Sequence, residues 1–259
     1  RRHRQHVRNI YAMVRVADEI VDGVAAEAGL TAAEQQETLD RYIADTHRAM
    51  RTGYSSDRVI HAFAHTARAA GIDESLTQPF FGSMRADLGV EGAEPLIYDE
   101  AAHSRYVYGS AEVVGLMCLR VFVRDRRLDQ AQLQRLEHGA RRLGAAFQNI
   151  NFLRDLADDT DRLGRSYLGT APRLSDADRD EWVRTVRAQL DDARAVIPLL
   201  PQDARAAVRS ALALFAALTD RVDRTPVSEL YRTRVRVPDP VKAGLAARAV
   251  ITTWMERES

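Results

Sequence analysis

The sequence predicts an all-α protein, because helical periodicity dominates it and the alternating pattern of β-strands is scarce. Alanine, leucine, arginine and glutamate, which all favour helices, are abundant. Capping residues, glycines and prolines divide the chain into segments of helical length. Neither a linker nor an internal repeat is visible, so we expect a single domain over residues 1–259, built as one helical bundle.

In the N-terminal half, polar caps and glycines mark the ends of the expected helices. Thr31 followed by Glu34 is a capping box, and Gly53 and Gly71 end two of the segments. The expected helices are Arg4 to Val24, Thr31 to Met50, Asp57 to Ala70 and Asp73 to Leu88. The segment Gly89 to Ile97 is expected to be a loop.

In the C-terminal half, Asp99 and Ser175 are expected N-caps, and Pro201 starts a helix. The expected helices are Asp99 to Arg124, Asp129 to Arg162, Ser175 to Leu199, Pro201 to Val222, and one from the Pro238 and Pro240 region to Arg257. A polar connection is expected at Leu163 to Ser175, and a short turn around Pro226 to Tyr231.

Composition indicates an ordinary soluble globular protein, with 46% hydrophobic and 29% charged residues. The formal net charge is zero, so no overall field favours nucleic acid. The single cysteine, Cys118, excludes an internal disulfide framework. No signal peptide is visible and the uncharged run Ser210 to Thr219 is too short to span a bilayer, so we expect a cytoplasmic protein. The chain opens on Arg1, and we expect a segment upstream of it.

An acidic stripe lies in the segment QNINFLRDLADD, from Gln148 to Asp159. On a helix its polar members fall within an arc of roughly 80°. They are Gln148, Asn151, Asp155 and Asp159. Apolar residues cover most of the remaining circumference, so this stripe is expected to line a cavity rather than face water. Two buried carboxylates one turn apart repel each other, and a cation is expected between them.

A second acidic pair, Asp18 and Asp22, lies in YAMVRVADEIVD. On a helix Tyr11 and Arg15 fall within about 60° of this pair. Either pair alone is typical of a solvated helix face, but two pairs that each accompany an arginine favour a shared site. Four carboxylates on two facing helices would suit Mg²⁺ or Mn²⁺. Because Mg²⁺ readily shares its shell with phosphate oxygens, the implied substrate carries a diphosphate.

Three segments together resemble the squalene and phytoene synthases, the head-to-head prenyl transferases. They are YAMVRVADEIVD, YVYGSAEVVGLM from Tyr106 to Met117, and QNINFLRDLADDTDRLGRSYL from Gln148 to Leu168. The resemblance extends over nearly the whole chain in the same order. It implies an all-α isoprenoid synthase bundle in which two acidic motifs face each other across a central cavity and bind Mg²⁺.

The resemblance also implies roles for individual residues. The implied metal ligands, which are also catalytic, are Asp18, Asp22, Asp155 and Asp159. The implied substrate-binding residues are Tyr11, Arg15, Gln148, Asn151, Arg154, Arg165 and Arg234. Tyr106 is an implied catalytic residue, whose hydroxyl would contact a phosphate or assist proton removal.

The implied reaction joins two geranylgeranyl diphosphates into phytoene through a cyclopropyl diphosphate, with Mg²⁺, or Mn²⁺ in its place. The alternative is a dehydrosqualene or squalene synthase that uses farnesyl diphosphate, with NADPH required only if squalene is the product. The implied partners are prenyl diphosphates, together with a membrane surface contacted peripherally or the next carotenoid enzyme, and no nucleic acid.

The chain departs from the family pattern at several places. The expected flap before the first motif is not in this sequence, Glu112 stands where glycine is common, and Phe215 falls where many members have tyrosine. A non-catalytic family member acting as an assembly factor remains an alternative, although both acidic pairs are intact. A di-iron bundle would need two Glu-x-x-His units, and only Glu100 to His103 qualifies.

Overall fold

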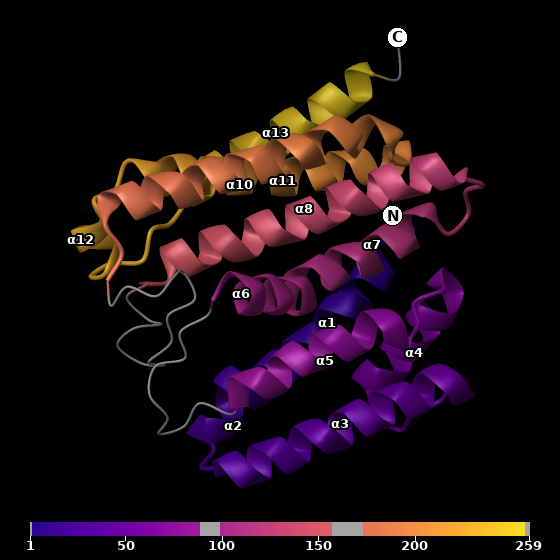
Figure 1. Ribbon diagram of the computed structural model, residues 1–259. Coiled ribbons are helices and arrows are strands. Elements are labelled where there is room, and N and C mark those ends of the chain that lie inside the picture. Colours follow the sequence, from indigo (N-terminus) through magenta and orange to yellow (C-terminus); the bar gives the residue numbers. More distant parts are fainter. Residues whose placement is uncertain (1, 89–98, 157–172, 257–259) are drawn as a thin grey trace. The chain divides into compact units, whose positions relative to one another are not determined.

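The computed structural model describes residues 2–88, 99–156 and 173–256 (Figure 1). These residues form helices joined by turns and contain no strand, which confirms the all-α prediction for the described part of the chain. The chain forms two compact units. Unit 1 is Arg1–Ala93 with Tyr108–Arg127, and unit 2 is Glu94–Val107 with Leu128–Ser259. The single domain stays a prediction.

Unit 1 consists of helices that share one apolar core. They are α1 (Arg4–Asp22), α2 (Val24–Glu27), α3 (Ala32–Thr52), α4 (Arg58–Ala70), α5 (Glu74–Leu88), the π-helix η1 (Tyr108–Glu112) and α7 (Val113–Val123). Met13, Leu39, Phe63, Phe81 and Met117 are fully or almost fully buried in this core. Long apolar side chains from five helices therefore position α1, which carries the first acidic pair.

The predicted caps of unit 1 are confirmed. Thr31 and Glu34 form a capping box at the start of α3, and the Asp57 carboxylate accepts hydrogen bonds from two backbone N–H groups of α4. Gly53 and Gly71 end these helices with φ values of 84° and 66°, a region that favours glycine.

Two predicted helices of this region are interrupted. The first helix ends at Asp22 rather than Val24, because Gly23 leaves the helical region at φ −144° and ψ −113°. The predicted helix from Asp99 to Arg124 is divided by η1. There Gly109 lies so close to α5 that an added Cβ would be 2.4 Å from the Pro79 carbonyl oxygen. This close approach and the local π-helix occur at the same place, and π-helical turns are often found at functional sites.

Unit 2 consists of α6 (Glu100–Val107), α8 (Gln130–Arg154), α10 (Asp176–Val196), the 3₁₀ turn η2 (Ile197–Leu199), α11 (Gln202–Asp223), α12 (Val227–Leu230) and α13 (Asp239–Met255). Helices α10 and α11 both pack on α8, and α13 runs along α11 (Figure 1). The core includes Ile150, Leu153, Val186, Val222 and Leu230, each at most 2% exposed.

Capping boxes at Asp129 and Ser175 confirm the predicted starts of α8 and α10. The helix predicted to run on to Arg162 is interrupted at Asp155, because α8 ends at Arg154 and Asp155 adopts φ −102° and ψ 13°. Leu156 is helical again, and residues 157–162 lie outside the described residues. The predicted turn around Pro226 contains the short helix α12, and α13 ends at Met255.

One run of described residues, Glu100–Val123, is long and apolar enough to cross a membrane by length and composition alone. Val113, Met117 and Val121 in this run are completely buried in the core of unit 1. Burial of this kind is typical of a core helix in a folded domain.

Candidate active site

The first acidic pair lies on α1, which stays helical from Arg4 to Asp22. The Arg15 guanidinium donates to the Asp18 carboxylate at 2.5 Å and also contacts Glu19. These are i,i+3 and i,i+4 pairs on one helix face, as the spacing predicts. Arg15 and Asp18 are about half exposed, with side-chain exposures of 52% and 40%.

Burial raises the pKa of Asp18 above its ordinary value, and the nearby carboxylates of Asp22 and Glu19 raise it further, while Arg15 opposes the shift. Two neighbouring carboxylates that repel each other form a site where a cation would be stabilised. The predicted proximity of Asp18 and Asp22 is therefore confirmed, whereas their binding of a metal stays a prediction.

Beside this pair, unit 1 has an apolar groove of about 570 Å³ between α1, α2 and α4. Val16, Ile20, Val24 and Val59 contribute to its lining, and Tyr11 lies at its edge with 66% exposure. The sequence analysis did not identify this groove, because its members come from three separate helices.

The second acidic segment has a different environment. Asp155 follows the last residue of α8, and its carboxylate is bound by Arg154 at 2.8 and 2.5 Å. Arg234, from the segment before α13, reaches the same carboxylate at 2.8 and 3.3 Å. The side chain of Asp155 is 20% exposed. Three residues predicted for the site are thus in direct contact.

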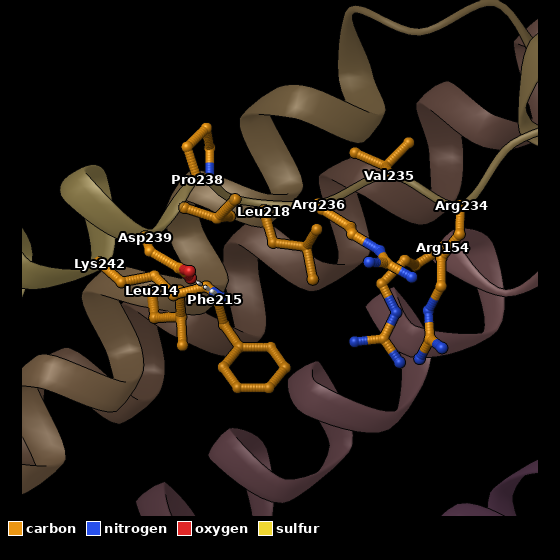
Figure 2. Close-up of a pocket in the computed structure, with 11 residues that line it drawn as sticks. Arg154, Leu214, Phe215, Leu218, Arg234, Val235, Arg236, Pro238, Asp239 and Lys242 are labelled. Atoms are coloured by element: carbon orange, nitrogen blue, oxygen red, sulfur yellow. Dashed lines mark hydrogen bonds and ion pairs between the residues drawn. The ribbon is translucent and has the colours of Figure 1, made fainter.

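A pocket of about 640 Å³ lies next to this cluster. Arg154, Arg234 and Arg236 gather at one end of it, and Leu214 and Phe215 lie toward the other (Figure 2). Further lining residues are Leu218, Val235, Val237, Pro238, Asp239 and Lys242. The pocket therefore combines a cationic end with an apolar wall, as an amphiphilic anion requires.

Sequence reasoning missed Arg236 and Lys242, although a signal for Arg236 was present. In RVRV the arginines Arg234 and Arg236 alternate with valines. An extended segment with this alternation places both arginines on the same side, with the valines on the other. The intermediate exposure of Val235, the burial of Val237 and the exposure of the two arginines agree with this pattern.

The two asparagines of α8 differ in their surroundings. The Asn151 side-chain oxygen is buried and has no hydrogen-bond partner among the described residues. Asn149, two residues earlier, pairs with His103 of α6 at 3.0 Å and donates to Gln189 of α10 at 3.2 Å. Asn149 therefore joins three helices, whereas Asn151 offers an unused acceptor one turn before Asp155.

Tyr106, the predicted catalytic tyrosine, is 8% exposed, and its ring lies 6.0 Å from that of Phe152 between centroids. Gln148 lies on α8 with intermediate exposure. Phe147 stacks on Phe215, with centroids 3.6 Å apart. The phenylalanine that stands at position 215 thus joins α8 to the wall of the pocket.

Asp159 and Arg165 lie outside the described residues, as does Asp158 between the motif positions. Among residues 2–88, 99–156 and 173–256, no three histidine, cysteine or acidic side chains gather as a metal site. The donor types nevertheless fit Mg²⁺, since Asp18, Asp22, Asp155 and the unused Asn151 oxygen are all hard oxygen ligands.

Solved structures with the same fold define the class of the protein. A ligand-bound dehydrosqualene synthase matches with a TM-score of 0.74 and 19% identity, covering 99% of this chain and 88% of that chain. A squalene synthase from Alicyclobacillus acidocaldarius matches with a TM-score of 0.70 and 18% identity, covering 89% and 85%. The fold is therefore that of the helical isoprenoid synthases.

The family follows from the sequence. The model of the squalene/phytoene synthase family matches residues 1–172, and the chain belongs to this family. Phytoene synthase 3 of Zea mays is 30% identical over 250 residues, covering 90% of this chain and 56% of the maize protein. The 15-cis-phytoene synthase of a Paracoccus species is 29% identical over 257 residues, covering 91% and 78%.

Proposed function

We propose that the protein is a prenyl transferase that condenses two geranylgeranyl diphosphates head to head into phytoene, through a cyclopropyl diphosphate, with Mg²⁺. The observation that carries this proposal is the Arg154, Asp155 and Arg234 cluster at the cationic end of an otherwise largely apolar pocket. The relatives named phytoene synthase support the same activity.

A prenyl diphosphate matches this pocket in both of its parts. Its diphosphate carries several negative charges, and guanidinium groups bind phosphate oxygens through two parallel hydrogen bonds. Its hydrocarbon tail gains free energy by leaving water, and Leu214, Phe215 and Leu218 offer it an apolar surface.

The residues that would hold Mg²⁺ are Asp18, Asp22 and Asp155, with Asp159 as the fourth ligand of the proposal. Bound Mg²⁺ supplies positive charge to the departing diphosphate, which favours ionisation of the allylic carbon–oxygen bond. Bringing both acidic pairs to the same ions is part of the proposal.

Residues of the chain would also stabilise the two charges that form when the carbon–oxygen bond ionises. Arg154 and Arg234 would stabilise negative charge on the leaving diphosphate through charge-assisted hydrogen bonds. The carbocation left behind must be kept from water, and the apolar side chains of Leu214, Phe215 and Leu218 in the pocket would shield it. The Tyr106 hydroxyl would contact a phosphate or assist the removal of the proton that is lost at the end of the reaction.

The product distinguishes this function from the alternatives. A dehydrosqualene or squalene synthase would make a C30 hydrocarbon from farnesyl diphosphate, the latter product with NADPH. The relative named farnesyl diphosphate phosphatase YisP of Bacillus subtilis, 26% identical over 191 residues, favours a further candidate that releases an alcohol.

The protein should be incubated with Mg²⁺ and each prenyl diphosphate, with and without NADPH. A C40 hydrocarbon is expected, and the absence of any product would contradict every enzymatic candidate.

Replacing Asp155 tests whether the acidic motif acts in catalysis or only in the scaffold. Asp155→Ala is expected to lower kcat by about 10³-fold or more, because it removes a metal ligand from the reacting centre. Asp45→Ala is the matched control, since Asp45 is an exposed acid that pairs with Arg48 on α3. Turnover by Asp155→Ala as fast as that by Asp45→Ala would contradict a catalytic role of Asp155, whereas the assembly factor predicts no turnover by the wild type either.

A hydrocarbon product requires an apolar acceptor, so we propose a cytoplasmic enzyme that contacts a membrane peripherally or passes its product to the next carotenoid enzyme. Co-sedimentation with phospholipid vesicles measures the first contact directly. Protein that stays in the supernatant at all lipid concentrations would leave transfer to an enzyme as the route.

A further inference from the structure

Two arginines contact the carboxylate of Asp155. Its Oδ1 accepts a hydrogen bond from Nε of Arg154 at 2.8 Å and lies 2.8 Å from Nε of Arg234 as an ion pair. Its Oδ2 accepts from the terminal nitrogens of the same arginines, at 2.5 and 3.3 Å. Both oxygens of the carboxylate thus contact both guanidinium groups, through three hydrogen bonds and one ion-pair contact. A divalent cation must therefore compete with two arginines for this carboxylate.

We infer that this cluster is an ion-exchange latch, in which a diphosphate and Asp155 compete for the same two arginines. The inference rests on the proposed function for the identity of the anion. When a diphosphate takes the arginines, the carboxylate is released and becomes available to a cation. Anion binding and cation binding at this site are then coupled through Arg154 and Arg234.

The surroundings allow such an exchange. Arg234 is 43% exposed, and both arginines line the pocket, so an anion can reach them without unfolding a helix. Arg236 lines the same pocket and adds a third guanidinium that a diphosphate can use. A diphosphate carries more charge than one carboxylate and offers more acceptor atoms, so it competes effectively for the forks.

The position of Asp155 in the backbone suits its release. It follows the end of α8 with non-helical φ and ψ, so its side chain can turn without disturbing the helical hydrogen bonds before it. The unpartnered oxygen of Asn151 lies one turn earlier and is a second oxygen ligand for a cation. In the proposed latch, the two arginines therefore neutralise the Asp155 carboxylate until a diphosphate binds to them.

The latch predicts that Asp155→Asn tightens pyrophosphate binding in the absence of Mg²⁺ and weakens it in the presence of Mg²⁺. Pyrophosphate binding should be measured by calorimetry, first in EDTA and then in Mg²⁺. In EDTA, Asp155→Asn should bind pyrophosphate about tenfold more tightly than the wild type, because the arginines no longer have a competing carboxylate. In Mg²⁺ the same variant should bind more weakly than the wild type, because it lacks a ligand for the cation that accompanies the anion.

Asp239→Asn is the matched control. Asp239 lines the same pocket but pairs with Lys242, so its replacement removes a negative charge without touching the latch. It should tighten pyrophosphate binding only slightly in EDTA and show no reversal in Mg²⁺. A second variant, Arg234→Gln, should weaken pyrophosphate binding, and Asp155→Asn added to it should restore less than it gains in the wild type. Thermal melts of all variants establish that each is folded.

Several results would overturn the latch. One is an equal change in pyrophosphate affinity for Asp155→Asn and Asp239→Asn in EDTA. Another is a pyrophosphate affinity of Asp155→Asn in EDTA that is unchanged or weaker than that of the wild type. A third is that neither the wild type nor Asp155→Asn binds pyrophosphate. Failure of the proposed function would look different. In that case no prenyl diphosphate is turned over, whereas the tightening in EDTA persists.

Discussion

The two acidic segments have similar sequence patterns but different partners. On α1, Asp18 pairs with Arg15, three residues away on the same continuous helix. At the end of α8, Asp155 pairs with Arg154 next to it and with Arg234, which is 79 residues away in the sequence. The first arrangement follows from helical spacing alone. The second depends on the folding of unit 2, because α11 and α12 must lead the chain back to α8.

The largest effect that we expect from comparing the two segments is on kcat/KM, when Arg234 and Arg15 are each replaced by lysine. Arg234→Lys should lower kcat/KM by about 100-fold, because lysine cannot bind a carboxylate or a diphosphate through a planar fork. Arg15→Lys should have a smaller effect, about tenfold or less, because its partners lie on its own helix and are half exposed. Initial rates with radiolabelled prenyl diphosphate would measure both. A larger loss for Arg15→Lys would reverse the comparison.

Close helix contacts sharpen the comparison between the units. A Cβ on Gly109 in unit 1 would meet the backbone oxygen of Pro79 at 2.4 Å, whereas a Cβ on Gly139 in unit 2 would meet a methyl group of Val196 at 2.1 Å. A backbone carbonyl cannot move aside, so Gly109→Ala should lower the free energy of unfolding by about 2 kcal/mol or more. Gly139→Ala should cost less, because a side chain can adjust.

Urea denaturation would measure these free energies, with Gly82→Ala as the control. No atom lies within 4 Å of a Cβ at Gly82 on α5, and alanine there should add up to about 1 kcal/mol through helix propensity. If Gly109→Ala were as stable as Gly82→Ala, the close contact between η1 and α5 would be wrong.

We expect the two asparagines of α8 in unit 2 to have different roles, Asn149 in stability and Asn151 in the candidate site. Asn149→Ala should lower the free energy of unfolding by about 1.5 kcal/mol, because it removes the hydrogen bonds of Asn149 with His103 and Gln189. Asn151→Ala should change stability by less than about 0.5 kcal/mol, since its oxygen makes no hydrogen bond within the described residues. Thermal denaturation would compare the two variants, and equal losses would mean that Asn151 is also structural.

Local patterns predicted the helices well and the site only in part. The capping box predicted at Thr31, the N-cap predicted at Ser175 and the helix start predicted at Asp129 are confirmed, because each involves only four consecutive residues. The end of α8 at Arg154 was missed because the apolar pattern of NFLRDL continues as a helix. Asp155 and Arg234 could each be assigned to the site by resemblance, but their contact depends on the packing of distant segments.

The same limit applies to the pocket and to the asparagines. The sequence does not show that Leu214, Phe215 and Leu218 line a pocket, because helical spacing does not distinguish a pocket wall from a packed interface. The resemblance implied a site role for Asn151 and none for Asn149. Only the surrounding helices show which of the two amide oxygens already has a hydrogen-bond partner.

The smallest expected effect concerns pH and the first acidic pair. Burial and the Asp22 carboxylate raise the pKa of Asp18, so the folded protein holds this proton more tightly than the unfolded chain does. Without divalent cations, stability should therefore fall as pH rises from the ordinary aspartate value through the raised one, by less than about 1 kcal/mol because the side chain is partly exposed. Asp18→Asn should remove this fall.

Asp40 provides the opposite case on α3. Hydrogen bonds from Arg85 lower the pKa of Asp40, so its contribution to stability is present above the ordinary aspartate value and is lost as pH falls through the lowered one. Melting temperatures measured in EDTA from about pH 3 to pH 7 should therefore move in opposite directions for Asp18→Asn and Asp40→Asn relative to the wild type. If Asp18→Asn melts lower than the wild type at neutral pH, the carboxylate is stabilised by Arg15 more than it is destabilised by burial, and the first acidic segment would need no cation.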